Sequence, residues 1–215
     1  SNIKTIQNLP LKLSTEKMPK KLIVAAEVYS LIADFQRIND TLKKMEMKTF
    51  ANPRNFAAGT VRQLDPIIAY KRNLQIYIHG IIEIDAQLSL SNHSESMSYL
   101  SKIGFHTCNL NKKINNFDQA VDYFDDISIK RDKLPYEIDG IVYKVDNYEL
   151  RDLIGYISKA PKWSIAYKFP SQVAQTKIIN VTFQVGRTGV VTPVAELEPL
   201  SIGGVTVSSC LLYTS

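Results

Sequence analysis

One stretch decides the fold of this chain more than any other: residues 134–146, LPYEIDGIVYKVD. Its apolar and β-branched residues alternate with an acid, a glycine and a lysine, which is typical of a β-strand. In a regular strand, Asp139 and Tyr143 would share one face, and Gly140 and Lys144 the other. A glycine beside an acid permits a ligand to approach the backbone closely. An edge strand with solvent-facing Asp139 and Lys144 also explains the pattern, and this segment alone favours that interpretation.

Further strands and helices are expected on both sides of this stretch. Residues 22–29, 74–84 and 163–169 are rich in apolar and β-branched residues and predict strands. From about residue 30 to 45, apolar residues recur every three or four positions, which predicts a helix with one buried face. Residues 118–127 suit a shorter helix.

The segment ANPRNFAAGTVRQLDP, residues 51–66, opens with turn residues and then becomes helix-compatible until a proline closes it. It carries Arg54 and Arg62, which lie about two helical turns apart and so on roughly one side.

After Pro170 the chain is rich in Val, Thr, Ile and Gly and has almost no helical pattern. This texture predicts a small β-barrel or β-sandwich. The expected domains are residues 1–170 and 171–215.

The composition is that of a soluble globular protein, with 45% hydrophobic and 22% charged residues. We expect a cytoplasmic location, since no segment reads as a membrane span or signal peptide. The spacing of Cys108 and Cys210 supports neither a disulfide framework nor a zinc site. The net charge of +5 permits an anionic partner such as DNA.

Several side chains are candidates for binding phosphates or a nucleotide. Lys168 lies between two aromatic residues, where a phosphate would balance its charge, although it could also reach solvent. His79 could stack on a base, although its position in a strand favours a core histidine, and Glu27 could accept a ribose hydroxyl or be a surface acid. A polyphosphate cradle would form if five cations met in space: Arg54, Arg62, Arg131, Lys144 and Lys168.

Four segments, taken together, resemble the NAD-dependent DNA ligase family. They occur in the family's order and span essentially the whole chain: FANPRNFAAGTVRQLDP (50–66), LPYEIDGIVYKVD (134–146), APKWSIAYKFP (160–170) and VGRTGVVTPVAELEP (185–199). The resemblance implies an α+β fold: a nucleotidyltransferase adenylation core with antiparallel sheets, related to ATP-grasp-like ligases, followed by a partial OB-fold barrel.

The resemblance also assigns roles by position. It implies that Glu27 binds the adenosine ribose, that His79 stacks on adenine, and that Arg54 and Arg62 are needed for nick sealing. Further implied site residues are Arg131, the acid-glycine pair Asp139 and Gly140, and the two lysines near the AMP phosphate, Lys144 and Lys168. The chain departs from the family at Ala25-Ala26, where Arg-Gly is usual, and at Phe56, where a small residue is usual.

The reaction implied is nick sealing in double-stranded DNA, as in replication and repair, by a monomeric enzyme with no membrane partner. A lysine takes AMP from NAD, the AMP passes to the 5′-phosphate of the nick, and the 3′-hydroxyl then displaces it, with magnesium offsetting phosphate charge. Asp139 is a candidate to contact that metal or the lysine.

The family's nucleophile lies in a Lys-x-Asp-Gly word, which does not occur in this sequence. We therefore expect an inactive fragment whose nucleophile lies upstream and whose family zinc site lies downstream. Residues 210–215 depart from the family pattern, and we make no fold prediction for them. The alternatives are an ATP-dependent ligase or RNA-capping enzyme, against which residues 52–66 and 186–199 argue, and a non-catalytic OB-type module that binds nucleic acid or nucleotide.

Overall fold

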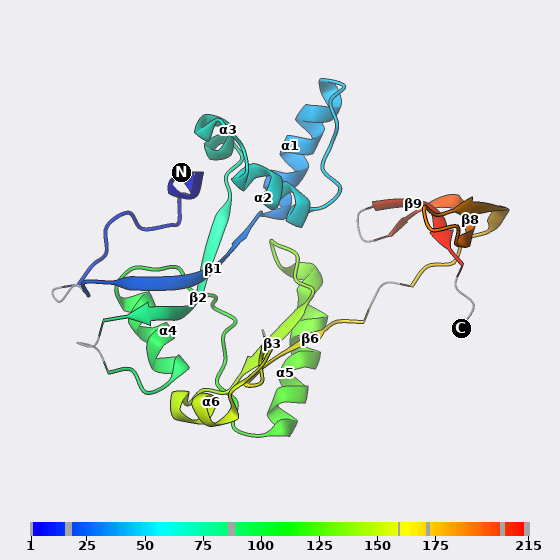
Figure 1. Ribbon diagram of the computed structural model, residues 1–215. Helices are drawn as coiled ribbons and strands as arrows, with labels where there is room; N and C mark the ends of the chain where they lie inside the picture. Colours follow the sequence, from blue (N-terminus) through cyan, green and yellow to red (C-terminus); the bar gives the residue numbers. More distant parts are fainter. Residues whose placement is uncertain are drawn as a thin grey trace. The chain divides into compact units, whose positions relative to one another are not determined.

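The computed structural model describes residues 2–15, 19–85, 89–158, 160–170, 173–202 and 205–212. Helices and strands are both abundant, and the ladders between named strands all run antiparallel. The expected mixture of helix and sheet is thus confirmed (Figure 1). The chain divides into two compact units, Ser1–Phe169 and Pro170–Ser215.

The larger unit contains a long ladder between β1 (Leu22–Tyr29) and β2 (Gln75–Ile84). Both strands were expected at these positions from their apolar, β-branched residues. Before β1 lies the short helix η1 (Asn2–Thr5). Helices connect the two strands and continue after β2: α1 (Ile32–Lys44), α2 (Pro53–Val61), α3 (Pro66–Lys71) and α4 (His93–Lys102).

The core of this unit lies where β2 meets α2 and α4. Alternate residues of β2, Ile76 and Ile78, are almost fully buried, as a strand with one covered face requires. They cluster with Phe56 from α2 and Leu100 from α4. The predicted helix at 30–45 begins at Ile32, and its apolar residues pack against the same cluster from outside.

A second ladder joins β3 (Gly140–Lys144) to β6 (Ser164–Lys168). Helix α5 (Phe117–Lys130) runs alongside it in Figure 1, and the phenol of Tyr143 donates to the Ala120 carbonyl at 2.7 Å. The remaining elements of the unit are η2 (Arg131–Lys133), α6 (Tyr148–Ile154), β4 (Tyr156–Ile157) and β5 (Ala160–Pro161).

The structure corrects two details of the sequence prediction. Residues 134–139 are not regular strand, because the Pro135 carbonyl accepts a hydrogen bond from Ile32 and the Tyr136 ring packs edge-on against Tyr29. Pro66 opens α3 instead of closing a helix. Asp65 caps that helix by accepting a hydrogen bond from the Ile67 N–H at 2.8 Å.

The smaller unit is rich in strand, as its composition predicted. Its described residues form an antiparallel sheet in the order β7 (Ile178–Val185), β8 (Val191–Ile202) and β9 (Val205–Leu211). The β7–β8 hairpin closes through Gly189, whose φ of 83° is accessible to glycine at little cost. No closed barrel is found within the described residues of this unit.

None of the helices among the described residues has the length and apolar character needed to cross a membrane.

The packing around Phe56 explains how a large side chain fits at a position where the resembled family has a small one. Its side chain is fully buried, with the Phe50 and Phe35 rings edge-on at centroid distances of 5.2 and 6.1 Å. The Arg72 guanidinium lies over the same ring at 5.8 Å.

We therefore predict that Phe56→Ala lowers the free energy of unfolding by about 3–5 kcal/mol, since it removes a packed ring and leaves a cavity. Urea denaturation of the full chain measures this. Phe117→Ala is the matched control, because that ring is 79% exposed and should cost little. Equal losses in the two variants would contradict the core assignment.

Candidate functional site

A β-bulge in β2 displays His79. Ala25 pairs with Gly80 and Ala26 pairs with Ile78, so His79 is the extra residue between two paired positions. Such a bulge twists the strand and redirects a side chain, often at a functional site. The Ala25-Ala26 departure therefore lies in the regular strand opposite the bulge.

Lys144, at the end of β3, reaches across to this bulge. Its ammonium donates to the His79 carbonyl oxygen at 3.1 Å and lies 3.5 Å from His79 Nδ1. None of the ion pairs found among the described residues involves Lys144. Burial, together with the charge of Arg151, lowers the Lys144 pKa. The structure thus brings together side chains that are 65 residues apart in sequence and leaves the ammonium without a carboxylate.

Glu27 belongs to the same region. It lies on β1 opposite Tyr77, is exposed, and is close enough for its charge to act on His79. Desolvation of the His79 ring and the charge of Lys144 lower the His79 pKa, and Glu27 opposes them. His79 therefore lies within the reach of two opposite charges, those of Glu27 and Lys144.

Lys168 and Asp139 form a second pair at the other end of the β3–β6 ladder. Lys168 Nζ lies 3.5 Å from Asp139 Oδ2, and both side chains are about 70% exposed, at 69% and 72%. Such an exposed pair contributes little to stability. The sequence alternation had placed Asp139 on the face opposite Gly140 and Lys144. Because Asp139 lies just before the regular strand, its carboxylate instead reaches Lys168, which shares the face of Gly140 and Lys144.

Gly140 is required by the approach of one strand to the other. A Cβ built at this position would lie 2.5 Å from the Tyr167 carbonyl oxygen and 2.7 Å from the Lys168 Cα. Both atoms are backbone, so neither can move aside cheaply. The sequence suggested close approach of a ligand, but here the close neighbour is β6.

The other predicted cations make different contacts. Arg131 stacks over the buried Phe169 ring at 5.2 Å and pairs with Asp132 at 3.5 Å. Arg54 lies in α2 and Arg62 caps its end, both exposed. Both arginines belong to a different element from the strands that carry the two lysines, and the five-cation cradle stays a prediction.

The sequence did not predict a further group near Lys144, which contains His93 and Asp146. His93 opens α4, and its N–H donates to the Asp146 carbonyl at 2.8 Å. Burial would raise the Asp146 pKa, but hydrogen bonds from Lys113 and Ser94 lower it to about 2. The Asn92 cap, with Glu95 three residues later, is a helix-start signal that could have revealed α4.

Comparison with known proteins identifies the family. The family model described as the NAD-dependent DNA ligase adenylation domain matches residues 1–172, and the one described as the NAD-dependent DNA ligase OB-fold domain matches residues 175–215. The chain belongs to the NAD-dependent DNA ligase family.

Curated relatives of this ligase-family chain are similar along almost its whole length. It is 45% identical over 213 residues to a DNA ligase of Legionella pneumophila (strain Lens), covering 99% of this chain and 32% of the relative. A DNA ligase of Bacillus subtilis (strain 168) is 43% identical over 212 residues, 99% of this chain and 31% of the relative. The chain thus spans about a third of the length of these ligases.

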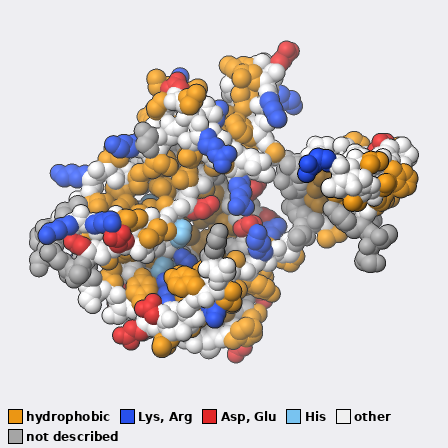
Figure 2. Space-filling view, viewed as in Figure 1, with side chains coloured by type: hydrophobic (Ala, Val, Ile, Leu, Met, Phe, Trp, Pro, Cys, Tyr) orange, Lys and Arg blue, Asp and Glu red, His pale blue; other side chains and the backbone are white. Residues whose placement is uncertain are grey.

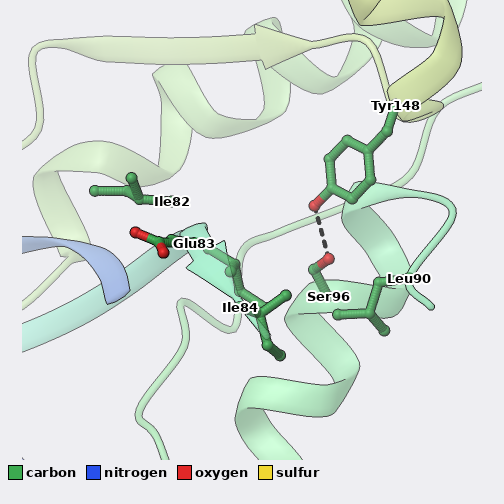
Figure 3. A pocket seen from close by; sticks show the side chains of 7 residues that line it. Ile82, Glu83, Ile84, Leu90, Ser96 and Tyr148 are labelled. Carbon is green, nitrogen blue, oxygen red and sulfur yellow. Dashed lines mark hydrogen bonds between the residues drawn. The ribbon is translucent and has the colours of Figure 1, made fainter. Parts of the chain in front are cut away.

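In Figure 2, histidine side chains (pale blue) lie beside basic and acidic ones in a hollow of the larger unit. A separate cavity of about 280 Å³ lies between the end of β2 and α4 and is largely apolar (Figure 3). Its polar lining comes from Glu83 and from Ser96 and Tyr148, which share a 2.6 Å hydrogen bond. No residue predicted for ligase chemistry lines it.

We predict that Gly140→Ala destabilises the protein by about 1–3 kcal/mol or more, since β3 and β6 must separate to admit the methyl group. Thermal or urea unfolding measures the loss. Gly80→Ala is the control, because its Cβ would meet only His93 Cε1 at an ordinary 3.7 Å. A fully stable Gly140→Ala protein would show that the strands do not approach so closely.

A second prediction concerns pH. Burial, reinforced by the charges of Lys144 and Arg151, lowers the His93 pKa to about 4, from 6.5 in the unfolded chain. The unfolded chain binds more protons between these values, so stability should fall as pH drops from 6.5 towards 4.

NMR titration of the histidine ring protons, with urea unfolding at each pH, measures both effects. His93→Gln should flatten this part of the stability profile. An ordinary histidine midpoint for His93 would refute its assignment as a half-buried ring that stays neutral.

Proposed function

We propose that this chain is the adenylate-binding part of an NAD-dependent DNA ligase that seals nicks in double-stranded DNA. Residues 1–170 would form the nucleotidyltransferase-type adenylation domain and residues 171–215 part of an OB-fold barrel. The observation that carries the proposal is the Lys144 ammonium, which is partly buried, contacts His79 and has no carboxylate partner among the described residues.

An ammonium in this position is suited to an anion. Removing a cation from water is unfavourable unless an opposite charge or strong acceptors replace the water. The contacts of Lys144 are a neutral carbonyl and an imidazole nitrogen, which compensate only part of its charge. A phosphate would complete the compensation by charge-assisted hydrogen bonding.

The neighbours of Lys144 suit the rest of an AMP group. The His79 ring, redirected by the bulge, offers a flat face for adenine, while the exposed Glu27 carboxylate can accept hydrogen bonds from ribose hydroxyls. Base, sugar and phosphate contacts would therefore come from β2, β1 and β3.

Lys168 supplies a second positive position on the same face. It lies directly opposite Gly140, and Lys144 is four residues further along β3, about 13 Å at the usual rise. Its weak contact with Asp139 can be exchanged for a phosphate oxygen. We assign both lysines to stabilising charge during AMP transfer.

In the proposed reaction, a lysine outside this sequence attacks the α-phosphorus of NAD and nicotinamide mononucleotide leaves. The AMP then passes to the 5′-phosphate of the nick, and attack by the 3′-hydroxyl joins the strands and releases AMP. Lys144 and Lys168 would hold the phosphate, while Arg54, Arg62 and Arg131 would hold nucleotide or DNA phosphates.

Magnesium stays a prediction from the family resemblance. No group of three His, Cys, Asp or Glu side chains in the described part of the chain could hold a metal ion, so we assign no step to one. The monomeric state and the cytoplasmic location likewise remain predictions.

The test is nick sealing by the complete ligase that contains this segment. Lys144→Ala and Lys168→Ala should each slow sealing by roughly 100-fold or more, because each removes a charge that stabilises the phosphoryl transition state. Lys43→Ala is the matched control, since that lysine is exposed on α1 and forms none of the ion pairs found. Normal sealing by both site variants, with intact folding, would refute the proposal.

A further inference from the structure

Arg151 is a buried cation directly behind the proposed phosphate lysine. It lies on α6 and is only 8% exposed. Its guanidinium packs over the Trp163 ring at 4.2 Å and the Tyr148 ring at 4.8 Å. Stacking on aromatic faces suits the flat, weakly hydrated guanidinium. The side chain is therefore held in one place.

This side chain also fixes the end of β3. Arg151 Nε donates to the Val145 carbonyl oxygen at 2.5 Å, and the Val145 N–H donates to the Trp163 carbonyl at 2.9 Å. Val145 directly follows Lys144, so both polar groups of the next residue are engaged. These contacts hold the Val145 backbone and so fix the position of Lys144 at the end of β3.

The charge of Arg151 is not balanced by an ion pair. Its Nη2 is buried and has no hydrogen-bond partner, and none of the ion pairs among the described residues includes it. An apolar side chain at this position would avoid the desolvation cost. The cation nevertheless sits where its charge reaches Lys144 and His93.

We infer that Arg151 is a positioning residue for Lys144: it holds the end of β3 and keeps the Lys144 ammonium over His79 as an uncompensated cation for a phosphate. The inference rests on the proposed function of Lys144. It assigns Arg151 no contact with substrate, because the guanidinium is enclosed by Trp163, Tyr148 and the backbone of β3.

The charged and titratable groups around Lys144 come from several elements. His79 faces it from β2, His93 from α4 and Arg151 from α6. Asp146 lies two residues further on and is engaged by Lys113, and Glu27 on β1 acts on His79. After burial, the charge of Arg151 is the influence that lowers the Lys144 pKa. Removing that charge must therefore raise the pKa and reduce the fraction of neutral amine at any given pH.

The experiment measures acetylation of Lys144 by acetic anhydride in the full chain, followed by mass spectrometry between neutral and strongly alkaline pH. Arg151→Met removes the charge but keeps an apolar stem. We expect its Lys144 midpoint to move to higher pH, with labelling below the midpoint slower by roughly threefold or more. Labelling of Lys168 in the same sample serves as the internal reference.

Arg151→Lys separates charge from packing. It keeps the cation, so the Lys144 midpoint should stay near that of the parent chain, and nick sealing in the complete ligase should be partly rescued relative to Arg151→Met. A folded Arg151→Met chain with an unchanged midpoint would overturn the inference. If Arg151→Met does not fold, a Lys144 midpoint raised in folded Arg151→Lys overturns it, because charge would then not be the cause.

The result is distinguishable from failure of the proposed function. If Lys144→Ala seals nicks normally while Arg151→Met still moves the Lys144 midpoint, the proposed phosphate role is wrong, and with it the catalytic meaning of the positioning. If Lys144→Ala abolishes sealing and Arg151→Met leaves both the midpoint and sealing unchanged, only the inference about Arg151 fails.

Discussion

The close approach of β3 and β6 at Gly140 is the constraint on which the candidate site depends. With no Cβ at this position, the backbone of Tyr167 and Lys168 can lie where a side chain would otherwise stand. The Phe169 N–H then donates to the Asp139 carbonyl at 2.9 Å, which continues the ladder beyond the regular strand. Two segments that are distant in sequence are thereby joined, and their lysines are placed on one face of the ladder.

The two lysines of this face occupy different electrostatic environments. Lys168 is exposed and has Asp139 beside it. Water and salt already weaken the attraction within this ion pair. Lys144 is partly buried, faces neutral acceptors and has the fixed cation Arg151 behind it. The second arrangement costs stability, and a phosphate bound as proposed would relieve that cost. We therefore regard Lys144 as the phosphate anchor and Lys168 as the more adaptable charge.

Much of the fold follows from sequence periodicity, whereas the site depends on contacts that periodicity does not encode. The strand at Leu22–Tyr29 was predicted at its observed bounds, because its apolar and β-branched residues form one run that only Glu27 interrupts. The bulge at His79 was not foreseeable, since an extra residue changes the pairing register without changing the local composition. Arg151 was missed for a related reason: a lone arginine in a polar stretch gives no sign that Trp163 will cover it.

The family resemblance and the structure contribute different halves of the argument. Similarity names the segments that matter, but it does not say which of them meet, and His79 lies outside all four segments quoted for the resemblance. The structure brings that residue to Lys144 and leaves Arg54 and Arg62 on a separate helix. A single cradle of five cations is therefore not needed to explain the chemistry. In the proposed function, one pair of strands would hold the AMP phosphate, and the exposed arginines in and at the end of α2 would be available for the phosphates of DNA.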